Sequence, residues 1–440
     1  MLSILLATHN FYPYYQGGTE VYVLNLAKHL QKLGHQVAVI SAMDEIQFTN
    51  QNTIFEDLNI RICNYTYEDI SVYGVLTENI STIHIYSKYS EPHIESYYSF
   101  FTDKYFDLLH IHGFTATIGL DLIYAVKKAG SAIKVITSYH TPISDPKETL
   151  TFSNTLTEIH YPLNHVADLL SYRLNLPYSF ASSMVKLLPK FYLKVLPAIF
   201  NIKYLVKLSV ESFSKLVDLT DEWWVYSEGI RKHLIEIGID SSKIRFERHG
   251  VSSEFIGNVN LATKPTKFLF SGRMLKIKGF HTLIKAWSGL TENNEKELWI
   301  TGKPESDDMF ISKFIKKVIS RNDIRWLGQL NQKQLAEIYA QVNWVIIPSE
   351  CYETGPLVFH EAIAGGCSVI ASDIGGCKEL AAHYHNFSTT FETGNSIDLK
   401  LKIAQNLGLN RTHFKEVKVL SFYQHFSAIL QQSTILTDNN

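Results

Sequence analysis

Four charged side chains in the second half of this 440-residue chain lie in or beside loops that follow apolar runs. Arg273 and Lys278 belong to SGRMLKIKG, and Glu353 and Glu361 belong to CYETGPLVFHEAIAGG. Two cations in one loop can neutralise a pair of phosphates. A carboxylate accepts hydrogen bonds from vicinal hydroxyls such as those of a ribose. The four residues therefore predict a site for a ligand that carries both kinds of group.

A helix that begins at about Pro356 adds uncharged donors to this site. The N–H groups of Leu357 and Val358 have no partner inside the helix, because the first turn lacks preceding carbonyls. Glu353 comes just before this helix, and Glu361 lies about two turns inside it, on the face of Leu357 and Val358. The alternative for Glu361 is a capping or surface residue, and the alternative for loop cations is simple solvation.

A second candidate anion site lies near the start of the chain, in HNFYPYYQGGTE. Gly17 and Gly18 let backbone N–H groups approach a ligand closely, and the helix expected from about Thr19 directs its positive end to the same place. A plain Gly-Gly turn is the alternative. The motif is not GxGxxG, which argues against a dinucleotide-cofactor fingerprint.

The elements that must position these loops alternate between strand and helix. SILLAT, a helix closed by Gly34, and QVAVIS begin the series; DLLHIHG, a helix over about 115–129, and IKVITSYH continue it. This order predicts parallel sheets with crossover helices. Ligands of such sheets bind beyond the carboxyl ends of the strands. A second series starts at KFLFSGR, so we predict an α/β fold of two doubly wound, Rossmann-like domains.

The predicted domains are 1–257 and 258–409, with a helical tail at 410–440 and a helical insertion at about 151–214. In the insertion, Lys186, Lys190 and Lys194 recur at helical spacing, and aromatic residues lie among them. Such a face over 186–207 can associate peripherally with an anionic membrane surface. The alternative is a set of short helices, divided by prolines, that pack on the first domain with a solvated lysine face.

Composition excludes several classes of protein. Lys plus Arg total 41 against 43 Asp plus Glu, so no overall field favours nucleic acid as a partner. The four cysteines have no CxxC spacing, which is typical of reduced thiols in a cytoplasmic protein. We expect no signal peptide and no spanning helix, because the apolar runs are too short.

Several motifs in fixed order resemble one family. They are PYYQGGTE, DLLHIHG, SYHTP, VYSEGIRKHL, HGVSSEF, SGRMLKIKGF and ETGPLVFHEAIAGGCSVIASDIGGCKEL. The set is similar to the retaining, nucleotide-sugar-dependent glycosyltransferases of family 4, which have the GT-B fold. The resemblance runs from the first strand to about Asn406, without much of 151–210. It implies two Rossmann-like domains that face each other across a cleft.

The resemblance also implies roles for particular residues. His140 would line the reaction centre beside the transferred sugar, and Glu353 would bind hydroxyls of that sugar. Arg273 and Lys278 would neutralise the leaving diphosphate, and Glu361 would hold the ribose. Gly17 and Gly18 would contact the donor, Leu357 and Val358 would donate backbone N–H bonds to its phosphates, and the remaining donor-binding positions would be Gly272 and Gly355.

The implied reaction is transfer of a hexosyl-type sugar from a nucleoside diphosphate to a saccharide or a polyprenyl- or other lipid-linked acceptor. It would serve surface polysaccharide or glycolipid synthesis, in the cytoplasm or peripherally on the inner face of the membrane. Arg273 and Lys278 would supply the positive charge, so we expect no metal and no cofactor. Alternatives are a nucleotide-sugar epimerase and a non-catalytic nucleotide-sugar-binding scaffold.

Three features stand apart from the family pattern or compete with it. The glycine of ETGP comes one residue earlier than is usual, and Pro356 removes one N–H donor. His249 stands where asparagine is usual. His110 and His112 suggest a metal pair, but we place the two side chains on opposite faces of their strand and expect no shared ion.

Overall fold

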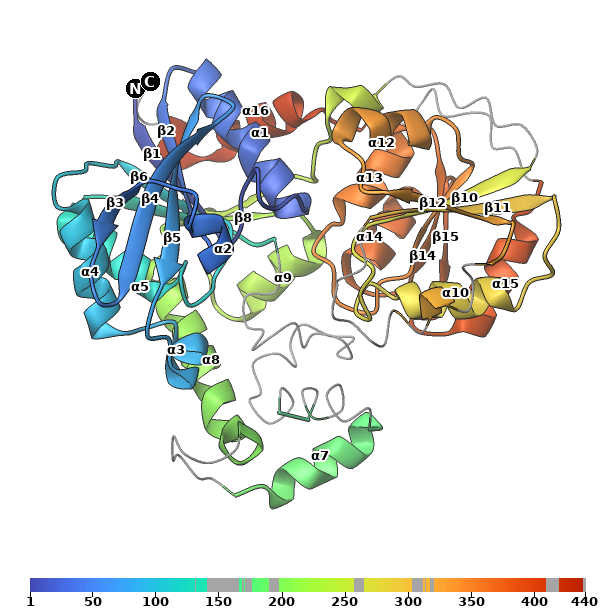
Figure 1. Cartoon of the computed structure of the whole chain (residues 1–440), viewed down its shortest axis with the longest axis horizontal. Coiled ribbons are helices and arrows are strands. Elements are labelled where there is room, and N and C mark those ends of the chain that lie inside the picture. Colours follow the sequence, from blue (N-terminus) through green and yellow to red (C-terminus); the bar gives the residue numbers. More distant parts are fainter. Residues whose placement is uncertain are drawn as a thin grey trace. The chain divides into compact units, whose positions relative to one another are not determined.

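The computed structural model describes residues 1–130, 132–140, 166–167, 170, 176–189, 198–256, 265–302, 312, 314–316, 320–408 and 419–437. The chain divides into two compact units (Figure 1). Unit 1 comprises Met1–Glu247 and Phe426–Asn440, and unit 2 comprises Arg248–His425. The units divide after residues 247 and 425, whereas the sequence predicted domain boundaries after residues 257 and 409. The predicted linker at 258–266 lies largely outside the described residues.

Unit 1 is built on a sheet in which nine strands are described, in the order β3-β4-β5-β2-β1-β6-β7-β8-β9. The strands are β1 (Ser3–Thr8), β2 (Gln36–Ala42), β3 (Thr53–Glu56), β4 (Ile60–Tyr67), β5 (Ile70–Thr77), β6 (Leu108–Ile111), β7 (Lys134–Ser138), β8 (Glu222–Val225) and β9 (Ile244–Phe246). The pairings β5–β2, β2–β1, β1–β6, β6–β7, β7–β8 and β8–β9 are parallel, as predicted. Short buried runs of this kind suit a sheet that is covered by helices on both faces.

One edge of the unit 1 sheet departs from the predicted parallel pattern. Strand β4 pairs antiparallel with both β3 and β5. The turn between β4 and β5 has Glu68 and Asp69 at φ 46° and 65°. Two successive residues with positive φ make a hairpin turn whose twist matches the strands. Glu-Asp is not the usual Asn-Gly pair for such a turn, so the hairpin could not be predicted from the sequence.

Ten α-helices are described in unit 1 or at its boundary with unit 2. They are α1 (Gly18–Lys32), α2 (Glu45–Phe48), α3 (Thr82–Ser87), α4 (Glu91–Phe101), α5 (Leu120–Ala129), α7 (Tyr178–Leu187), α8 (Ala198–Leu219), α9 (Glu228–Glu236), α16 (Phe422–Gln432) and α17 (Thr434–Thr437). The helix predicted over 115–129 starts only at Leu120, because Thr115 Oγ1 accepts from the Ile118 N–H in a turn before it. The predicted insertion at 151–214 is described only in part, and Lys190 and Lys194 lie outside the described residues.

Unit 2 has a sheet of six described strands that are parallel throughout, in the order β12-β11-β10-β13-β14-β15. The strands are β10 (Thr266–Ser271), β11 (Lys296–Thr301), β12 (Ile324–Gly328), β13 (Trp344–Ile347), β14 (Ser368–Ser372) and β15 (Ser388–Phe391). The named helices are α10 (Phe280–Ser288), α12 (Gln332–Tyr339), α13 (Leu357–Ala364), α14 (Gly375–His383) and α15 (Ser396–Gln405).

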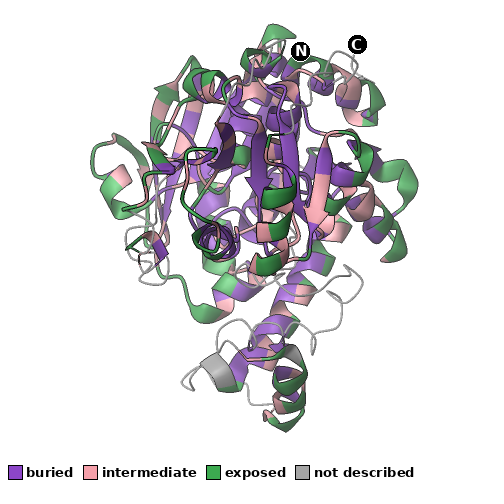
Figure 2. Ribbon diagram, turned by 90° about the vertical axis from the view of Figure 1, so that its right-hand side faces the viewer, coloured by how far each residue is buried: buried purple, intermediate pink, exposed green. Residues whose placement is uncertain are grey.

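The core of unit 2 has two layers. On one face of the sheet, α12, α13 and α14 contribute buried residues that include Tyr339, Phe359 and Leu380. On the other face, α10 and α15 contribute residues that include Trp287 and Ile403. Figure 2 shows buried strands and exposed outer faces of helices. The predicted α/β class with two Rossmann-like units is confirmed. Among the residues described, no helix combines the length and the apolarity needed to cross a bilayer.

Candidate functional site

The loop after β10 carries the two predicted cations of unit 2. Gly272 follows the strand with φ 148°, a conformation that favours glycine. Buried Met274 and Ile277 hold the loop against the core. Arg273 is exposed, and the side chain of Lys278 is 27% exposed. The loop therefore presents both cations at the carboxyl end of a central strand, as the sequence predicted.

Gly279 brings this loop against the loop that follows β13. It has φ 65°, and a Cβ atom there would overlap the carbonyl oxygen of Pro348. The Glu350 N–H also donates to the Ile277 carbonyl at 2.7 Å. Only glycine permits this approach, which places residues 75 positions apart in contact.

Gly279→Ala should lower the free energy of unfolding by about 2–5 kcal/mol, through left-handed backbone strain and overlap with Pro348. Gly328→Ala is the matched control, because Gly328 has φ 69° and, apart from its chain neighbours, no atom of the described residues lies within 4 Å of the position of its Cβ. We expect that control to cost only about 1–2 kcal/mol. Denaturant unfolding of both variants measures the difference. Equal losses would show that the contact with Pro348 is not needed.

Lys278 and Glu353 form the centre of the site. Lys278 Nζ donates to Glu353 Oε1 at 2.6 Å, and Ser349 Oγ donates to the same oxygen at 2.7 Å. The Glu353 side chain is only 15% exposed. Burial alone would raise the pKa of Glu353, but Lys278, Ser349 and Arg273 outweigh it and hold that pKa below its ordinary value. Glu353 is therefore a carboxylate at neutral pH.

The same pair fixes the charge of the lysine. Burial opposes the ammonium form, but the Glu353 carboxylate outweighs it and raises the pKa of Lys278 above its ordinary value. Lys278 is therefore a cation at neutral pH, held at the end of β10 and beside Arg273.

Helix α13 starts next to this pair. It begins at Leu357 after Pro356, which confirms the predicted start. Leu357 and Val358 are half-buried, and Gly355 has φ 147°. The Gly376 N–H at the start of α14 donates to the Glu353 carbonyl at 2.6 Å. The glycine pair Gly375–Gly376 thus packs against the loop that carries Glu353 and sets the position of that loop.

Glu361 is buried in α13, at 6% exposure, so the surface alternative is wrong. Burial raises its pKa to about 7, and a hydrogen bond from Tyr339 opposes the shift only in part. Tyr339 Oη donates to Glu361 Oε2 at 3.4 Å. In the part of the chain that the structure describes, this long hydrogen bond is the one that reaches the carboxyl group, so the protein solvates that buried group poorly. It is thus suited to accept hydrogen bonds from a ligand that supplies hydroxyls.

The predicted residues of unit 1 lie around α1 and the end of β7. Gly17 caps α1 and Gly18 is its first residue, as the glycine pair predicted. The half-buried His140 ring stacks on Tyr226 at 4.8 Å and meets the edge of Tyr22, in α1, at 4.7 Å. Tyr22 lies one turn after Gly18, so His140 and the start of α1 belong to one region of unit 1.

The expectation that kept His110 and His112 apart was wrong. Side chains two residues apart on a strand point to the same face, and the two ring centroids are 4.0 Å apart. His110 Nε2 is hydrogen-bonded to Ser138 Oγ at 2.8 Å, and His112 Nδ1 to His140 Nε2 at 3.0 Å. Burial lowers the pKa of both His110 and His112 well below the ordinary value. They are neutral rings that support the end of β7 and His140.

Two family models match the chain on either side of its middle. The model "Glycosyl transferases group 1" matches residues 252–416, and "Glycosyltransferase Family 4" matches residues 16–175. The chain belongs to the group 1 type of glycosyltransferases. Every predicted site residue lies within one of the two matched ranges.

Sequence relatives of this glycosyltransferase cover only parts of it. An uncharacterized glycosyltransferase of Methanocaldococcus jannaschii is 28% identical over 167 residues, which are 38% of this chain and 40% of the relative. The lipopolysaccharide 1,2-N-acetylglucosaminetransferase of Salmonella typhimurium is 30% identical over 129 residues, or 28% of this chain and 34% of that protein. The chain therefore matches less than half the length of these relatives.

Solved structures match the whole chain and show its fold. Sucrose-phosphate synthase from Thermosynechococcus elongatus has a TM-score of 0.61 at 14% identity. The match covers 100% of this chain and 97% of the synthase chain. HepE of Anabaena, solved with UDP and glucose, has a TM-score of 0.58 at 14% identity with the same coverage. The fold of this glycosyltransferase is GT-B.

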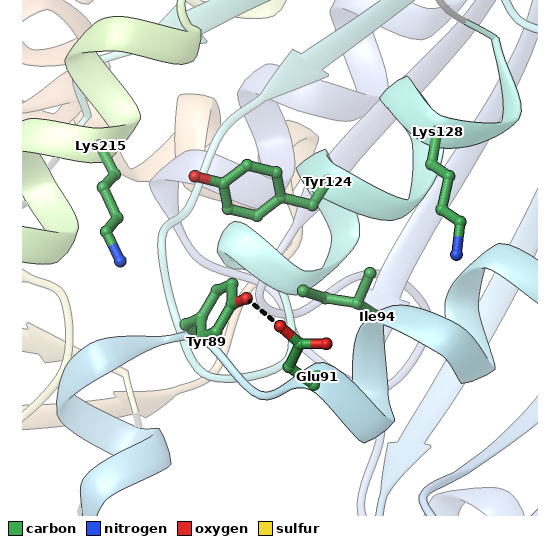
Figure 3. A pocket seen from close by; sticks show the side chains of 6 residues that line it. All are labelled: Tyr89, Glu91, Ile94, Tyr124, Lys128 and Lys215. Carbon is green, nitrogen blue, oxygen red and sulfur yellow. Dashed lines mark hydrogen bonds between the residues drawn. The ribbon is translucent and has the colours of Figure 1, made fainter.

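A pocket of about 410 Å³ opens elsewhere in unit 1, between α4, α5 and α8 (Figure 3). Figure 3 shows Lys128 and Lys215 on opposite sides of Tyr89 and Tyr124. Lys128 is paired with Glu95 at 2.7 Å, and Lys215 lies over the Tyr89 ring at 4.9 Å. None of the predicted site residues lines this pocket. It therefore does not replace the site at Lys278 and Glu353.

Sequence reasoning about this glycosyltransferase missed two polar residues beside the site. Ser349 donates to Glu353, and Glu350 accepts from Thr282 Oγ1 at 2.5 Å. Both follow the apolar run WVII after Pro348 and thus come just beyond the carboxyl end of β13. That position was a signal for them, since ligands bind beyond strand ends in such sheets.

Proposed function

We propose that this protein is a retaining glycosyltransferase that moves a hexosyl-type sugar from a nucleoside-diphosphate sugar to a saccharide or lipid-linked acceptor. The observation that carries the proposal is the Lys278–Glu353 pair at the start of α13. It holds a cation and a carboxylate 2.6 Å apart, both in their charged forms. The relative named for transfer of N-acetylglucosamine to lipopolysaccharide supports a role in surface polysaccharide or glycolipid synthesis.

Loss of the diphosphate is the step that unit 2 would assist. Breaking the bond to the anomeric carbon places negative charge on the departing phosphate. Arg273, Lys278 and the first N–H groups of α13, including those of Leu357 and Val358, would stabilise that charge. We propose that these groups supply the positive charge without a metal ion.

Glu353 would orient the sugar. Among the described residues, the two hydrogen-bond partners of its side chain, Lys278 and Ser349, both contact Oε1. This leaves Oε2 to accept from hydroxyls of the donor sugar. In unit 1 we propose that His140 lines the reaction centre and that Gly17 and Gly18 contact the donor through backbone N–H groups. For retention, the departing phosphate would take the proton of the acceptor hydroxyl on the same face.

Thermal unfolding with UDP, GDP, ADP and their sugars, first without metal and then with magnesium, tests this proposal. Ligand at about 100 times Kd should raise Tm by roughly 5–10 °C for the matching nucleotide. A selective shift without magnesium names the base and supports the metal-free site. No shift with any nucleotide would count against the site, and conversion of the donor to a second nucleotide sugar without acceptor would identify an epimerase instead.

A further inference from the structure

Helix α7 places large apolar side chains on its outer face. Its Ala181 and Val185 are buried in a small cluster with Ile202 and Val206 of α8. Phe180 is 56% exposed and Leu187 is 84% exposed. Residues seven apart lie on the same side of a helix. Phe180 and Leu187 therefore form an apolar stripe on a face of α7 that does not pack on α8.

The first turns of α8 also expose an apolar side chain. Phe200 is 41% exposed. Lys203 and Lys207 follow it by three and seven residues and so lie on its face of the helix. Lys207 is 62% exposed, and Lys186 of α7 is also exposed. We name as the α7–α8 surface the side chains of Phe180, Lys186, Leu187, Phe200, Lys203 and Lys207.

The charge of this part of the chain has one sign. Residues 169–210 contain no aspartate or glutamate, although the average for the chain is 43 in 440, which gives about four in a segment of that length. The same segment contains Arg173, Lys186, Lys190, Lys194, Lys203 and Lys207. Lys207 pairs with Glu211 of α8 at 3.4 Å, just beyond this segment. Within the segment itself no acid balances the basic residues, so the composition favours a negatively charged partner.

Figure 1 shows α8 leading from the body of unit 1 to α7 at its far end. The inner half of α8 is anchored there, because buried Ser212 Oγ donates to the Tyr86 carbonyl of α3 at 3.4 Å. The α7–α8 surface thus lies at the tip of a projection from unit 1. Exposed aromatic and aliphatic side chains flanked by lysines, with Glu211 as the acid that pairs with Lys207, match the interfacial region of an anionic bilayer.

We propose that the α7–α8 surface docks on a bilayer that contains anionic lipid headgroups. Phe180 and Leu187 enter the interfacial layer, and Lys186, Lys203 and Lys207 lie against the headgroups. This inference is independent of the proposed sugar transfer, since it rests on α7 and α8 and not on the site in unit 2.

Co-sedimentation of the full chain with vesicles tests the proposal. One set of vesicles is phosphatidylcholine, and the other is an equimolar mixture of phosphatidylcholine and phosphatidylserine. We expect binding to the mixed vesicles only, weakening as salt rises. Each lysine near the surface should contribute about fivefold to the partition coefficient. Absence of binding to the mixed vesicles would overturn the proposal, as would equal binding to both kinds.

Phe180→Ser with Leu187→Ser should reduce binding to the mixed vesicles by about tenfold or more, because the apolar contribution is lost. Ile397→Ser with Leu401→Ser is the matched control, since these α15 side chains are 71% and 52% exposed. The control should bind as the unaltered protein does. Equal binding by the two double variants would overturn the assignment to α7. The Tm shift with donor nucleotide should be the same in both, which separates this test from that of the proposed function.

Discussion

Lys278→Ala should lower the rate of sugar transfer by about 100- to 1000-fold, the loss seen when one group that stabilises developing negative charge is removed. It should also weaken the affinity for the nucleoside diphosphate by about 10- to 100-fold, since a charged hydrogen bond contributes about 1.5–3 kcal/mol. Both effects have one cause, because the ammonium is the cation that Glu353 and the loop after β10 hold in place. Initial rates and calorimetric titration measure them.

Loss of fold is the alternative explanation for an inactive Lys278→Ala protein. Glu353 is only 15% exposed, so removing its cation leaves a buried carboxylate unpaired and should lower the free energy of unfolding by about 3 kcal/mol. Adding Glu353→Gln removes that unpaired charge and should restore most of the stability. Lys333→Ala, at an exposed position of α12, should change neither property.

The affinity for the nucleoside diphosphate distinguishes the role of Lys278 from that of Glu353. Glu353→Gln alone should keep the affinity for the diphosphate, because Lys278 remains, while transfer slows as the sugar loses its carboxylate partner. The double variant should be stable but should bind the diphosphate weakly. Restored diphosphate affinity in the double variant would contradict a direct contact between Lys278 and phosphate.

The order of elements around the site was predictable because it is a local property. Apolar runs, helical spacing and loop glycines lie within a few residues of each other, so they indicated β10, β13 and the start of α13. The antiparallel β3–β5 edge was not indicated, because its turn at Glu68 and Asp69 has an uncommon composition. Local patterns thus located the loops but not every strand direction.

Contacts between distant loops were beyond prediction for a physical reason. The sequence provided Lys278 and Glu353 as separate candidates, and their hydrogen bond depends on the close approach of Gly279 to Pro348. The error over His110 and His112 had another cause, since residues two apart on a strand share a face. Burial of Glu361 is likewise a tertiary property, set by how α13 packs against Tyr339 of α12.

From the burial of Glu361 we predict that nucleotide affinity depends on pH. Its pKa of about 7 means that the group is largely protonated at pH 6 and largely ionised at pH 8. Ribose hydroxyls donate best to the carboxylate. Diphosphate affinity should therefore rise between pH 6 and pH 8. Because the ligand's own phosphate titrates near pH 6, the part due to Glu361 is the rise that disappears in Glu361→Gln.

The same shift affects the stability of the unliganded protein in the opposite direction. The pKa of Glu361 in the fold lies above its ordinary value of 4.5, so the folded state binds the proton more tightly than the unfolded state. Stability must then fall as pH rises from about 4.5 to 7, by about 3 kcal/mol from this group. Glu361→Gln should remove that slope, and Glu337→Gln, at an exposed position of α12, should retain it.

A ligand change tests the contact itself. At pH 8, a 2′-deoxynucleoside diphosphate should bind the unaltered protein about tenfold or more weakly than the ribonucleotide, because one charged hydrogen bond is lost. In Glu361→Gln the two nucleotides should bind within a few-fold of each other, both weakly. If the deoxy ligand loses as much affinity in the variant as in the unaltered protein, the 2′-hydroxyl has another partner. The raised pKa of Glu361 would then reflect its burial in α13 alone.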